Sequence, residues 1–262
     1  MEAKSTKVVF IGCSKFGLRC LDLLQSMSCV EISGVVTAPK TFPISYLKNS
    51  KFNNVLHADI TSYCDSKNLE CVSITKGMKD PKLFEKVKSW NPSFFVVAGW
   101  YHLLPSTWID LAPAYGLHAS LLPDYSGGAP LVWAMINGEK TTGISLFRMD
   151  KGVDSGPIVG QLEEEIKDHD SIATLYGRIE EKGLMLLRRE IPKIASGKFT
   201  LSEQDESKRK TYPQRNEDDG EIDWSWDPLR IKNFIRAQTK PYPGAFFYIE
   251  GKKVIVWDAD IS

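Results

Sequence analysis

Residues 7–37 read KVVFIGCSKFGLRCLDLLQSMSCVEISGVVT, and this stretch decides the fold class. Lys7–Gly12 is a short apolar, β-branched run that ends in glycine, which is typical of a buried parallel strand. Ser14 follows as a candidate helix N-cap, and apolar residues then recur at helical spacing as far as Leu24. Cys29–Thr37 reads as a second strand. The stretch therefore predicts a β-α-β unit, the building block of a parallel sheet.

Strand and helix patterns keep alternating beyond this unit, as far as residue 196. Strands are expected at Glu70–Ile74, Pro92–Ala98, Gly116–Ser120, Thr142–Met149 and Ile158–Ile166. Helices are expected at Ile60–Asn68, Asp80–Trp90, Leu104–Leu111, Ala129–Asn137 and Asp170–Ser196. Pro39–Asn54 has little periodicity and is expected to be a loop over the site. The alternation predicts an α/β fold with a doubly wound, mostly parallel, Rossmann-like sheet.

The last part of the chain differs in composition. Ser202–Glu221 is charged and polar and is interpreted as a linker. A helix at Pro228–Ala237 and a hairpin of Ala245–Ile249 with Lys253–Asp258 then predict a small helix-plus-hairpin subdomain. The expected boundaries are 1–200 for the catalytic domain, 201–222 for the linker and 223–262 for the C-terminal subdomain. A subdomain this small cannot bury a hydrophobic core alone. It is therefore expected to pack on the first domain or on a second subunit, and in the second case to form a homodimer through the hairpin.

Composition and charge narrow the class of protein. The formal net charge is zero, which argues against a large nucleic-acid footprint. The opening MEAKSTKVVFIG has no apolar run of signal-peptide length, and no run reaches membrane-span length, so a cytoplasmic protein without a membrane partner is expected. The five cysteines lack CxxC spacing and the four histidines lack HExxH context, so no metal site is expected.

The turn GCSKFG after the first strand invites comparison with dinucleotide-binding loops. Ser14 stands where that pattern needs its middle glycine, which lets the backbone approach a pyrophosphate. Leu18 after Gly17 also excludes a P-loop, which needs Lys and Ser or Thr there. The sequence therefore argues against a nicotinamide or flavin site.

Candidate chemistry gathers in residues 116–158, GLHASLLPDYSGGAPLVWAMINGEKTTGISLFRMDKGVDSGPI. His118 lies on an expected strand, and Asp150 and Asp154 lie in a glycine-punctuated loop after the next strand. Adjacent strands would bring the histidine and a carboxylate together, as in general acid–base catalysis. The alternative is a structural histidine with two turn aspartates. Trp100–His102 follow a central strand, where they could wall a flat ligand or simply cap the core.

The block from His118 to Pro130, with Trp133, Asn137–Gly138, Thr142–Ile144 and Met149–Gly156, resembles the formyltransferases that use 10-formyltetrahydrofolate. The tail is also similar, through Tyr212–Arg215, Ile222–Trp224, Asn233–Ala237 and Pro241–Ala245. It is most similar to the branch that formylates amino sugars on nucleotide carriers, with an expected place in polysaccharide biosynthesis.

This resemblance implies transfer of a formyl group from 10-formyltetrahydrofolate to the amine of a nucleotide-linked amino sugar, without a metal. His118 would be the general acid/base, since a histidine side chain changes charge near neutral pH. Asp154 would be its partner, and Gly116 completes the catalytic positions. The implied folate contacts are Trp100, Tyr101, His102, Ser120, Leu121, Leu122, Pro123, Asp150, Lys151, Gly152 and Val153. The implied acceptor contacts are Tyr212, Arg215, Asn233 and Arg236, although Asn233 and Arg236 could equally form an exposed polar helix face.

Two residues depart from the family pattern. Gly116 stands where the family usually has Asn, and loss of an oxyanion donor typically costs ~100- to 1000-fold in rate. Ser126 stands where the family tends to have Arg, so a phosphate or glutamate-tail contact is missing. Three alternatives stay open: a methionyl-tRNA formyltransferase, whose larger basic C-terminal domain is not expected here, a purine-pathway formyltransferase, and a catalytically silent folate- or nucleotide-binding protein.

Overall fold

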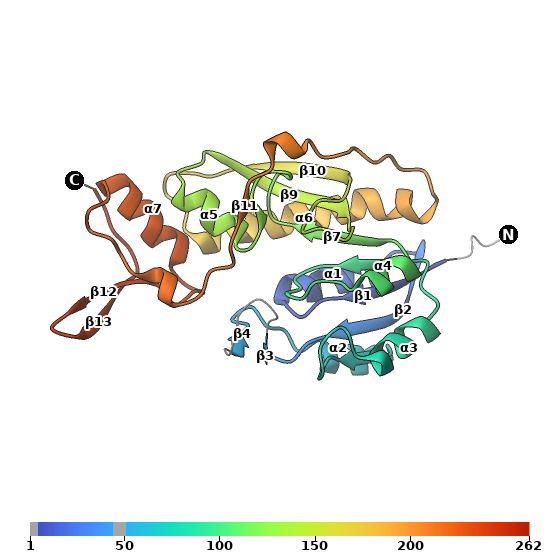
Figure 1. Ribbon diagram of the computed structural model, residues 1–262. Coiled ribbons are helices and arrows are strands. Elements are labelled where there is room, and N and C mark those ends of the chain that lie inside the picture. Colours follow the sequence, from blue (N-terminus) through green and yellow to red (C-terminus); the bar gives the residue numbers. More distant parts are fainter. Residues whose placement is uncertain (1–4, 44–50, 262) are drawn as a thin grey trace. The chain divides into compact units, whose positions relative to one another are not determined.

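The computed structural model describes residues 5–43 and 51–261 and contains a sheet of seven strands (Figure 1). Its strands, in the order in which they are bonded, are β10 (Ile158–Glu165), β9 (Thr141–Arg148), β7 (Ala114–His118), β6 (Phe94–Val97), β1 (Thr6–Ile11), β2 (Val30–Thr37) and β5 (Cys71–Ser73). β1 pairs in parallel with both β2 and β6, β2 with β5, and β6 with β7. The predicted mostly parallel, doubly wound fold is confirmed.

Helices lie between these strands along the chain and, for the last two, after β10. They are α1 (Lys15–Gln25), α2 (Ile60–Ser66), α3 (Pro81–Ser89), α4 (Ser106–Leu111), α5 (Pro130–Ile136), α6 (Ile172–Ala195) and α7 (Pro228–Gln238). Ser14 caps α1 as expected, because its hydroxyl accepts the Gly17 N–H at 3.0 Å. Asp80 caps α3 in the same way and Pro81 takes the first helical position.

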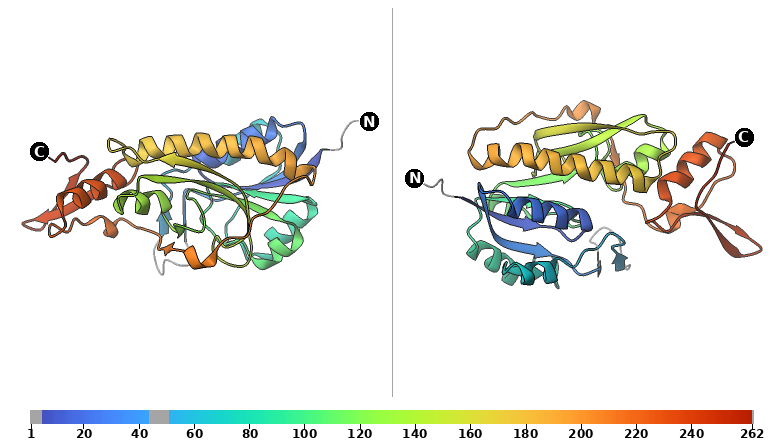
Figure 2. Two further views of the ribbon diagram at one scale, coloured as in Figure 1. Left: turned by 90° about the horizontal axis from the view of Figure 1, so that it is seen from above. Right: turned by 180° about the vertical axis from the view of Figure 1, so that it is seen from behind.

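Three short strand pairs lie outside the central sheet. They are β3 (Thr41–Pro43) with β4 (Lys51–Asn53), β8 (Ser126–Gly127) with β11 (Thr211–Tyr212), and β12 (Ala245–Ile249) with β13 (Lys252–Val256). The last pair is antiparallel and is the predicted hairpin, which extends from the rest of the C-terminal subdomain in both views of Figure 2.

One face of the parallel strands packs under α3 and α4. Val9 and Ile11 of β1 and Phe95 and Val97 of β6 alternate with residues of the opposite face, and all four belong to one buried cluster. Leu83 and Val87 of α3 and Trp108 of α4 close this cluster from the helix layer, and Trp108 is fully buried. Burial of these apolar side chains fixes the strands whose carboxyl ends carry the candidate site.

The chain packs as two compact units. Unit 1 consists of the described residues up to His118, together with 146–160 and 183–204. Unit 2 consists of residues 119–145, 161–182 and the described residues from 205. This division by packing does not test the predicted domain boundaries. No helix within 5–43 or 51–261 is both long enough and apolar enough to cross a bilayer.

Several expectations need correction. β7 ends at His118, two residues before the predicted end at Ser120, because the Ser120 hydroxyl donates to the Asp124 carbonyl oxygen within a turn. Pro39–Asn54 is not simply a loop, since β3 and β4 pair within it, while 44–50 lie outside the described residues.

The predicted linker also contains ordered structure, because Thr211–Tyr212 pair in parallel with Ser126–Gly127. On α6, Leu186 is fully buried and Leu184 only partly. The buried face of this helix therefore includes Leu186 rather than Leu184, which helical spacing predicted as its apolar position. β13 ends at Val256 rather than at Asp258.

Close packing of β2 against α3 gives the first prediction. A Cβ at Gly34 would lie 2.2 Å from two ring carbons of Trp90, whose indole N–H is held by Glu70 at 2.6 Å. We expect Gly34→Ala to lower the free energy of unfolding by about 1–3 kcal/mol through overpacking. Gly177→Ala on α6 is the matched control, because a Cβ there meets nothing within 4 Å. We expect this variant to raise the free energy of unfolding by about 0.5–1 kcal/mol. Urea unfolding followed by circular dichroism measures both, and equal midpoints for the two variants would contradict the packing argument.

Candidate functional site

The carboxyl ends of β6 and β7 meet at one edge of the sheet. The two strands run parallel with Val97 opposite Gly116, so this register, continued by two residues, brings His118 level with Gly99. Gly99 has φ +60°, and Trp100–His102 follow it. β1 and β6 are neighbours, with β2 beyond β1 and β7 beyond β6. The strand order thus reverses here, which is where α/β sheets bind ligands.

His118 and Asp154 face one another in unit 1. The imidazole Nδ1 lies 3.5 Å from Asp154 Oδ2, and the two side chains are 10% and 19% exposed. This separation exceeds an ordinary hydrogen bond, but it is close enough for a carboxylate to attract an imidazolium in a poorly solvated setting. Catalytic hydrogen bonds are often long before substrate binds. The structure therefore brings together the two residues predicted to be the acid/base pair.

The loop after β9 presents Asp154 in an unusual backbone conformation. Asp154 has φ +53°, a left-handed conformation that most residues other than glycine avoid and that aspartate adopts occasionally. Gly156 is required nearby, because a Cβ there would lie 1.8 Å from the Arg148 carbonyl oxygen. The Asp150 carboxylate accepts the Gly152 N–H at 2.9 Å and the Ser155 hydroxyl at 2.7 Å. Asp150 thus shapes the loop, while Lys151, Gly152 and Val153 are exposed on it.

Trp100, Tyr101 and His102 form a half-buried aromatic surface. The Trp100 and His102 rings are 5.3 Å apart, and His102 also packs 4.8 Å from Phe42. Burial lowers the pKa of His102, so its imidazole is neutral near neutral pH. Trp100 Nε1 and His102 Nε2 are buried without a hydrogen-bond partner among the residues that the structure describes.

The N-terminus of α1 is closed by the protein's own atoms. The Lys15 N–H donates to the Leu56 carbonyl oxygen at 2.8 Å, and Ser14 occupies the Gly17 N–H. A Cβ at Gly99 would lie 1.8 Å from the Ser14 hydroxyl, so that side chain fills the space in front of the helix. These contacts agree with the expectation that GCSKFG does not bind a dinucleotide, which needs exposed amides at this point.

The turn Ser120–Pro123 belongs to unit 2 and contains a cis Leu122–Pro123 bond. The Ser145 hydroxyl donates to the Ser120 carbonyl oxygen at 2.6 Å and accepts the Leu122 N–H at 3.1 Å. The Gln161 amide reaches the same hydroxyl at 2.8 Å and the Leu122 carbonyl oxygen at 3.0 Å. Ser120 and Leu122 are buried, and their predicted folate contact stays a prediction. Sequence reasoning missed Ser145 and Gln161, which look like ordinary strand residues.

Gly116 lies where a larger residue would have little room. A Cβ at Gly116 would lie 3.1 Å from a Phe147 ring carbon and 3.2 Å from the Met149 sulfur. Gly116 and His118 are two apart on β7, so this Cβ would project from the same face of the strand as the His118 side chain. Met149 thus packs where a side chain at Gly116 would begin.

In unit 2, Tyr212 and Arg215 are part of an aromatic cluster, which we call the Tyr212 cluster. Its members are Tyr125, Trp133, Tyr212, Arg215 and Phe234. The two tyrosine rings stack at 4.6 Å with an interplanar angle of 5°. The Arg215 guanidinium lies 4.7 Å from the Trp133 ring and donates to Gln238 Oε1 at 2.8 Å, and burial lowers its pKa. Tyr212 and Arg215 therefore both contact Trp133, while their contact with an acceptor stays a prediction.

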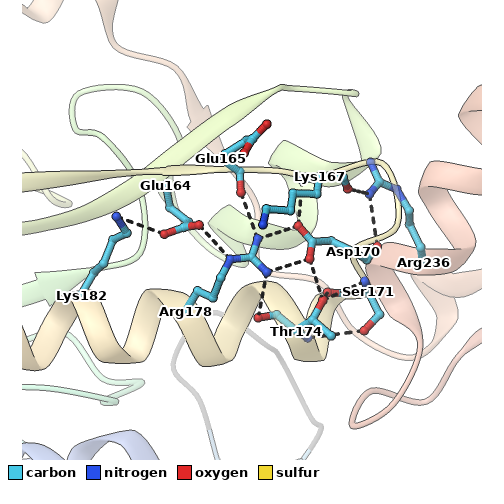
Figure 3. A network of polar contacts seen from close by, with 9 residues as sticks. All are labelled: Glu164, Glu165, Lys167, Asp170, Ser171, Thr174, Arg178, Lys182 and Arg236. Carbon is cyan, nitrogen blue, oxygen red and sulfur yellow. Dashed lines mark hydrogen bonds and ion pairs between the residues drawn. The ribbon is translucent and has the colours of Figure 1, made fainter.

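Asn233 and Arg236 are buried, so the interpretation of an exposed polar helix face is wrong. The Arg236 guanidinium donates to Asn233 Oδ1 at 2.8 Å. It also donates to the Lys167 carbonyl oxygen at 2.7 Å (Figure 3). It also reaches the Asp170 carbonyl oxygen at 3.2 Å. These bonds attach α7 to the loop before α6, while a contact of either residue with a nucleotide stays a prediction.

The same loop contributes Asp170 to an ion-pair network with residues of β10 and α6 (Figure 3). Asp170, 1% exposed at its side chain, accepts two hydrogen bonds from Arg178 at 2.6 and 2.7 Å. Arg178 also bonds Glu164 at 2.8 Å, and Lys182 pairs with Glu164 at 3.1 Å. Burial alone would raise the pKa of Asp170, but hydrogen bonds from Arg178, the Lys167 N–H and Thr174 outweigh it and hold the pKa at about 2.

Comparison with known proteins decides the family. A model of the formyl transferase family matches residues 6–191, and a model of the formyl transferase C-terminal domain matches residues 215–262. The chain belongs to the formyl transferase family. It is thus a formyl-transferring enzyme of a family that uses formyltetrahydrofolate. No group of three or more His, Cys, Asp or Glu side chains within 5–43 and 51–261 could hold a metal ion.

Individual relatives come from more than one branch of this family. A methionyl-tRNA formyltransferase of Caldanaerobacter subterraneus subsp. tengcongensis is 31% identical over 97% of this chain and 81% of its own length. A 4-N formyltransferase from Francisella tularensis has a TM-score of 0.75 and 21% identity, covering 98% of this chain and 99% of its own. An N-formyltransferase from Helicobacter canadensis, in complex with folinic acid and dTDP-3-aminofucose, has a TM-score of 0.69 and 17% identity, covering 95% and 86%.

The Asp170 network predicts an acid-labile contribution to stability. We expect Asp170→Asn to lower the free energy of unfolding at pH 7 by about 2–3 kcal/mol. Because the folded-state pKa is depressed, this contribution is present above the unfolded pKa near 4 and lost as pH falls through about 2. Denaturant unfolding at several pH values between 2 and 7 measures it, with Asp168→Asn, which removes an exposed pair with Lys140, as the control with little effect. A difference between wild type and Asp170→Asn that did not shrink below pH 4 would contradict the assignment.

Proposed function

We propose that the protein transfers a formyl group from 10-formyltetrahydrofolate to the amino group of a nucleotide-linked amino sugar. The pairing of His118 with Asp154 at the carboxyl edge of the sheet carries the proposal of catalysis. Family membership supplies the reaction class, and the Tyr212 cluster supports the class of acceptor.

The residues at the end of β6 suit a flat, polar donor molecule. Trp100 and His102 offer buried nitrogen atoms that lack partners among the described residues, which is costly unless a ligand or water satisfies them. Aromatic faces beside these atoms suit a pterin ring, which carries hydrogen-bonding groups along its edges. We propose that Trp100–His102 hold this ring, with Asp150–Val153 as further contacts. Bound formyltetrahydrofolate supplies an activated formyl carbon at N10.

His118, oriented by Asp154, would transfer the protons that the reaction requires. The acceptor nitrogen forms a bond to the formyl carbon while the bond from that carbon to N10 breaks. One proton leaves the acceptor nitrogen and one arrives at N10, so the products are a formamide and tetrahydrofolate. His118 would deliver the proton to N10 through Nε2, because Asp154 lies at Nδ1 and would hold the Nδ1–H. The carboxylate would also stabilise the imidazolium between these steps.

The Tyr212 cluster fits a nucleotide better than it fits a large RNA. The tyrosine and tryptophan rings are aromatic groups on which a base could stack, and the Arg215 guanidinium is a planar donor suited to a diphosphate. Many cations of unit 2 are already neutralised by carboxylates, which leaves less charge for an RNA backbone. These pairs are Lys140–Asp168, Arg178–Asp170, Lys210–Asp124, Lys232–Asp260 and Lys253–Glu217.

Methionyl-tRNA formyl transfer is the second candidate, favoured by the identity with the Caldanaerobacter relative. Both candidates share the donor and the chemistry, so only the acceptor distinguishes them. A silent folate-binding protein is the third, favoured by Gly116 and by the narrow space before Met149.

We also propose that the protein is a dimer through the hairpin. Exposed apolar side chains gather on and just after it, with 37–55% of each accessible: Tyr248, Ile249, Val254, Ile255 and Trp257. A second copy of the same hairpin would bury these side chains and extend the two-stranded sheet by pairing along its edge. Sedimentation equilibrium should give a dimer, and Ile249→Lys with Ile255→Lys should give a monomer. A wild-type monomer at micromolar concentration would refute the proposal.

The function is tested by tetrahydrofolate release from 10-formyltetrahydrofolate. The assay offers dTDP-, UDP- and GDP-linked amino sugars, methionyl-tRNA, and no acceptor. We expect release that depends on one amino sugar, with the formamide found by mass spectrometry. Release only with methionyl-tRNA would establish the second candidate, release without acceptor would indicate a hydrolase, and binding without release would indicate a silent protein.

The acid/base assignment is tested by His118→Ala and Asp154→Ala. Each should lower kcat by roughly 100-fold or more, because proton transfer by a positioned side chain typically contributes 10²–10⁴. His169→Ala and Asp110→Ala remove exposed side chains of the same types and are the controls, expected to keep the wild-type rate. Near-native rates for either His118→Ala or Asp154→Ala would remove the roles given to the pair.

A further inference from the structure

The loop that carries Asp154 is fixed at its base by backbone hydrogen bonds. The Arg148 N–H donates to the Pro157 carbonyl oxygen at 2.8 Å, and the Met149 N–H donates to the Ala114 carbonyl oxygen of β7 at 2.7 Å. These bonds hold the two ends of the loop but not the tip. At the tip, Asp154 keeps a left-handed conformation, which persists in proteins only where the surroundings over-determine it.

A single side chain bridges the carbonyl groups on both sides of this tip. Gln204 Nε2 donates to the Asp154 carbonyl oxygen at 2.8 Å and to the Gly156 carbonyl oxygen at 2.7 Å. A primary amide has two N–H donors, so one amide can satisfy both carbonyls. Both distances are those of well-formed hydrogen bonds.

Gln204 reaches the loop from ordered backbone. Ser202 and Ile158 form a two-way bridge, in which the Ile158 N–H donates to Ser202 O at 2.8 Å and the Ser202 N–H donates to Ile158 O at 2.9 Å. The bridge holds Ser202 beside Ile158, the first residue of β10. Gln204 follows Ser202 by two residues, and the Gln204 side chain is half-buried. Residues 202–204 thus belong to unit 1 together with His118 and Asp154.

We propose that Gln204 is a positioning residue for Asp154 and that, through it, the segment after α6 takes part in the acid/base pair. The Asp154 carbonyl and carboxylate share one Cα, so the hydrogen bond to the carbonyl fixes the direction in which the carboxylate leaves the backbone. That direction brings Oδ2 to 3.5 Å from His118 Nδ1. The kinetic consequence rests on the proposed formyl transfer, whereas the structural consequence does not.

Gln204→Met tests the role of the donors, because methionine keeps the length of the side chain and removes both N–H groups. We expect kcat to fall roughly 10- to 100-fold, since misplacement of a catalytic group by about 1 Å can cost 100-fold. The KM values for donor and acceptor should stay within about twofold, because binding contacts are untouched. Gln204→Arg keeps donors for both carbonyls and should retain most of the rate. Gln25→Met on α1 is the matched control, expected to be unchanged.

A double-mutant cycle separates positioning from general support of the fold. If Gln204 acts through Asp154, Gln204→Met should cause no further loss in an Asp154→Ala background. The same fold loss in both backgrounds, a changed KM with unchanged kcat, or failure of Gln204→Arg to retain activity would overturn the proposal.

Amide hydrogen exchange gives a readout that needs no activity. Peptides covering 150–157 should exchange at least about tenfold faster in Gln204→Met than in wild type or Gln25→Met, while peptides of α1 and α3 stay unchanged. If the wild type transfers no formyl group, the proposed function fails but this measurement still decides the role of Gln204. Unchanged exchange at 150–157 would overturn that role, whatever the enzyme does.

Discussion

The parallel pairing of β6 with β1 on one side and β7 on the other is the constraint on which the candidate site depends. Parallel strands end at the same edge of a sheet, so the register of Val97 with Gly116 brings the segment after β6 level with the end of β7. Strand register therefore places Trp100–His102 and the catalytic candidate His118 at the carboxyl edge of the sheet. No contact between their side chains is needed for this. The buried cluster beneath α3 and α4 fixes the strands, so the positions of these loops follow from the hydrophobic core.

Backbone geometry, more than side-chain choice, determines how Asp154 is presented. Gly156 allows the Arg148 carbonyl to close the base of the loop, and a residue with a Cβ could not stand there. Asp154 itself adopts a left-handed conformation, with φ +53°. Strain of this kind is common at functional sites, because the surrounding contacts determine a geometry that the residue alone would avoid. The hydrogen bonds from Gln204 are such contacts, and they come from a part of the chain distant in sequence.

Features that depend on the local sequence pattern were predictable, whereas contacts between residues far apart in the sequence were not. Alternating strands and helices, the caps at Ser14 and Asp80, and the hairpin follow from periodicity and capping chemistry, and the structure has them. The proximity of His118 and Asp154 was predictable because His118 ends β7 and Asp154 lies in the loop after the neighbouring strand β9. Gln204, Ser145 and Gln161 could not be found, since a glutamine in a polar stretch or a serine in a strand gives no signal of its partner. The burial of Arg236 could not be found for the same reason: one of its two interpretations was an exposed helix face, whereas three acceptors bind it in the interior.

The buried Arg236 also explains how a short C-terminal segment can be ordered. A helix and a hairpin have too little apolar surface to fold alone, so α7 must obtain its stability elsewhere. It packs on α5 and places a guanidinium against the backbone carbonyls of Lys167 and Asp170. Those carbonyls belong to the loop that Asp170 and Arg178 hold in place, so the ion-pair network stabilises the helix indirectly (Figure 3). Residues 161–182 and 228–238 therefore share one packing unit, although the family models divide them between two domains. A sequence boundary marks where composition and ancestry change, whereas a packing boundary marks where contacts thin out, and here the two differ because the tail has no core of its own.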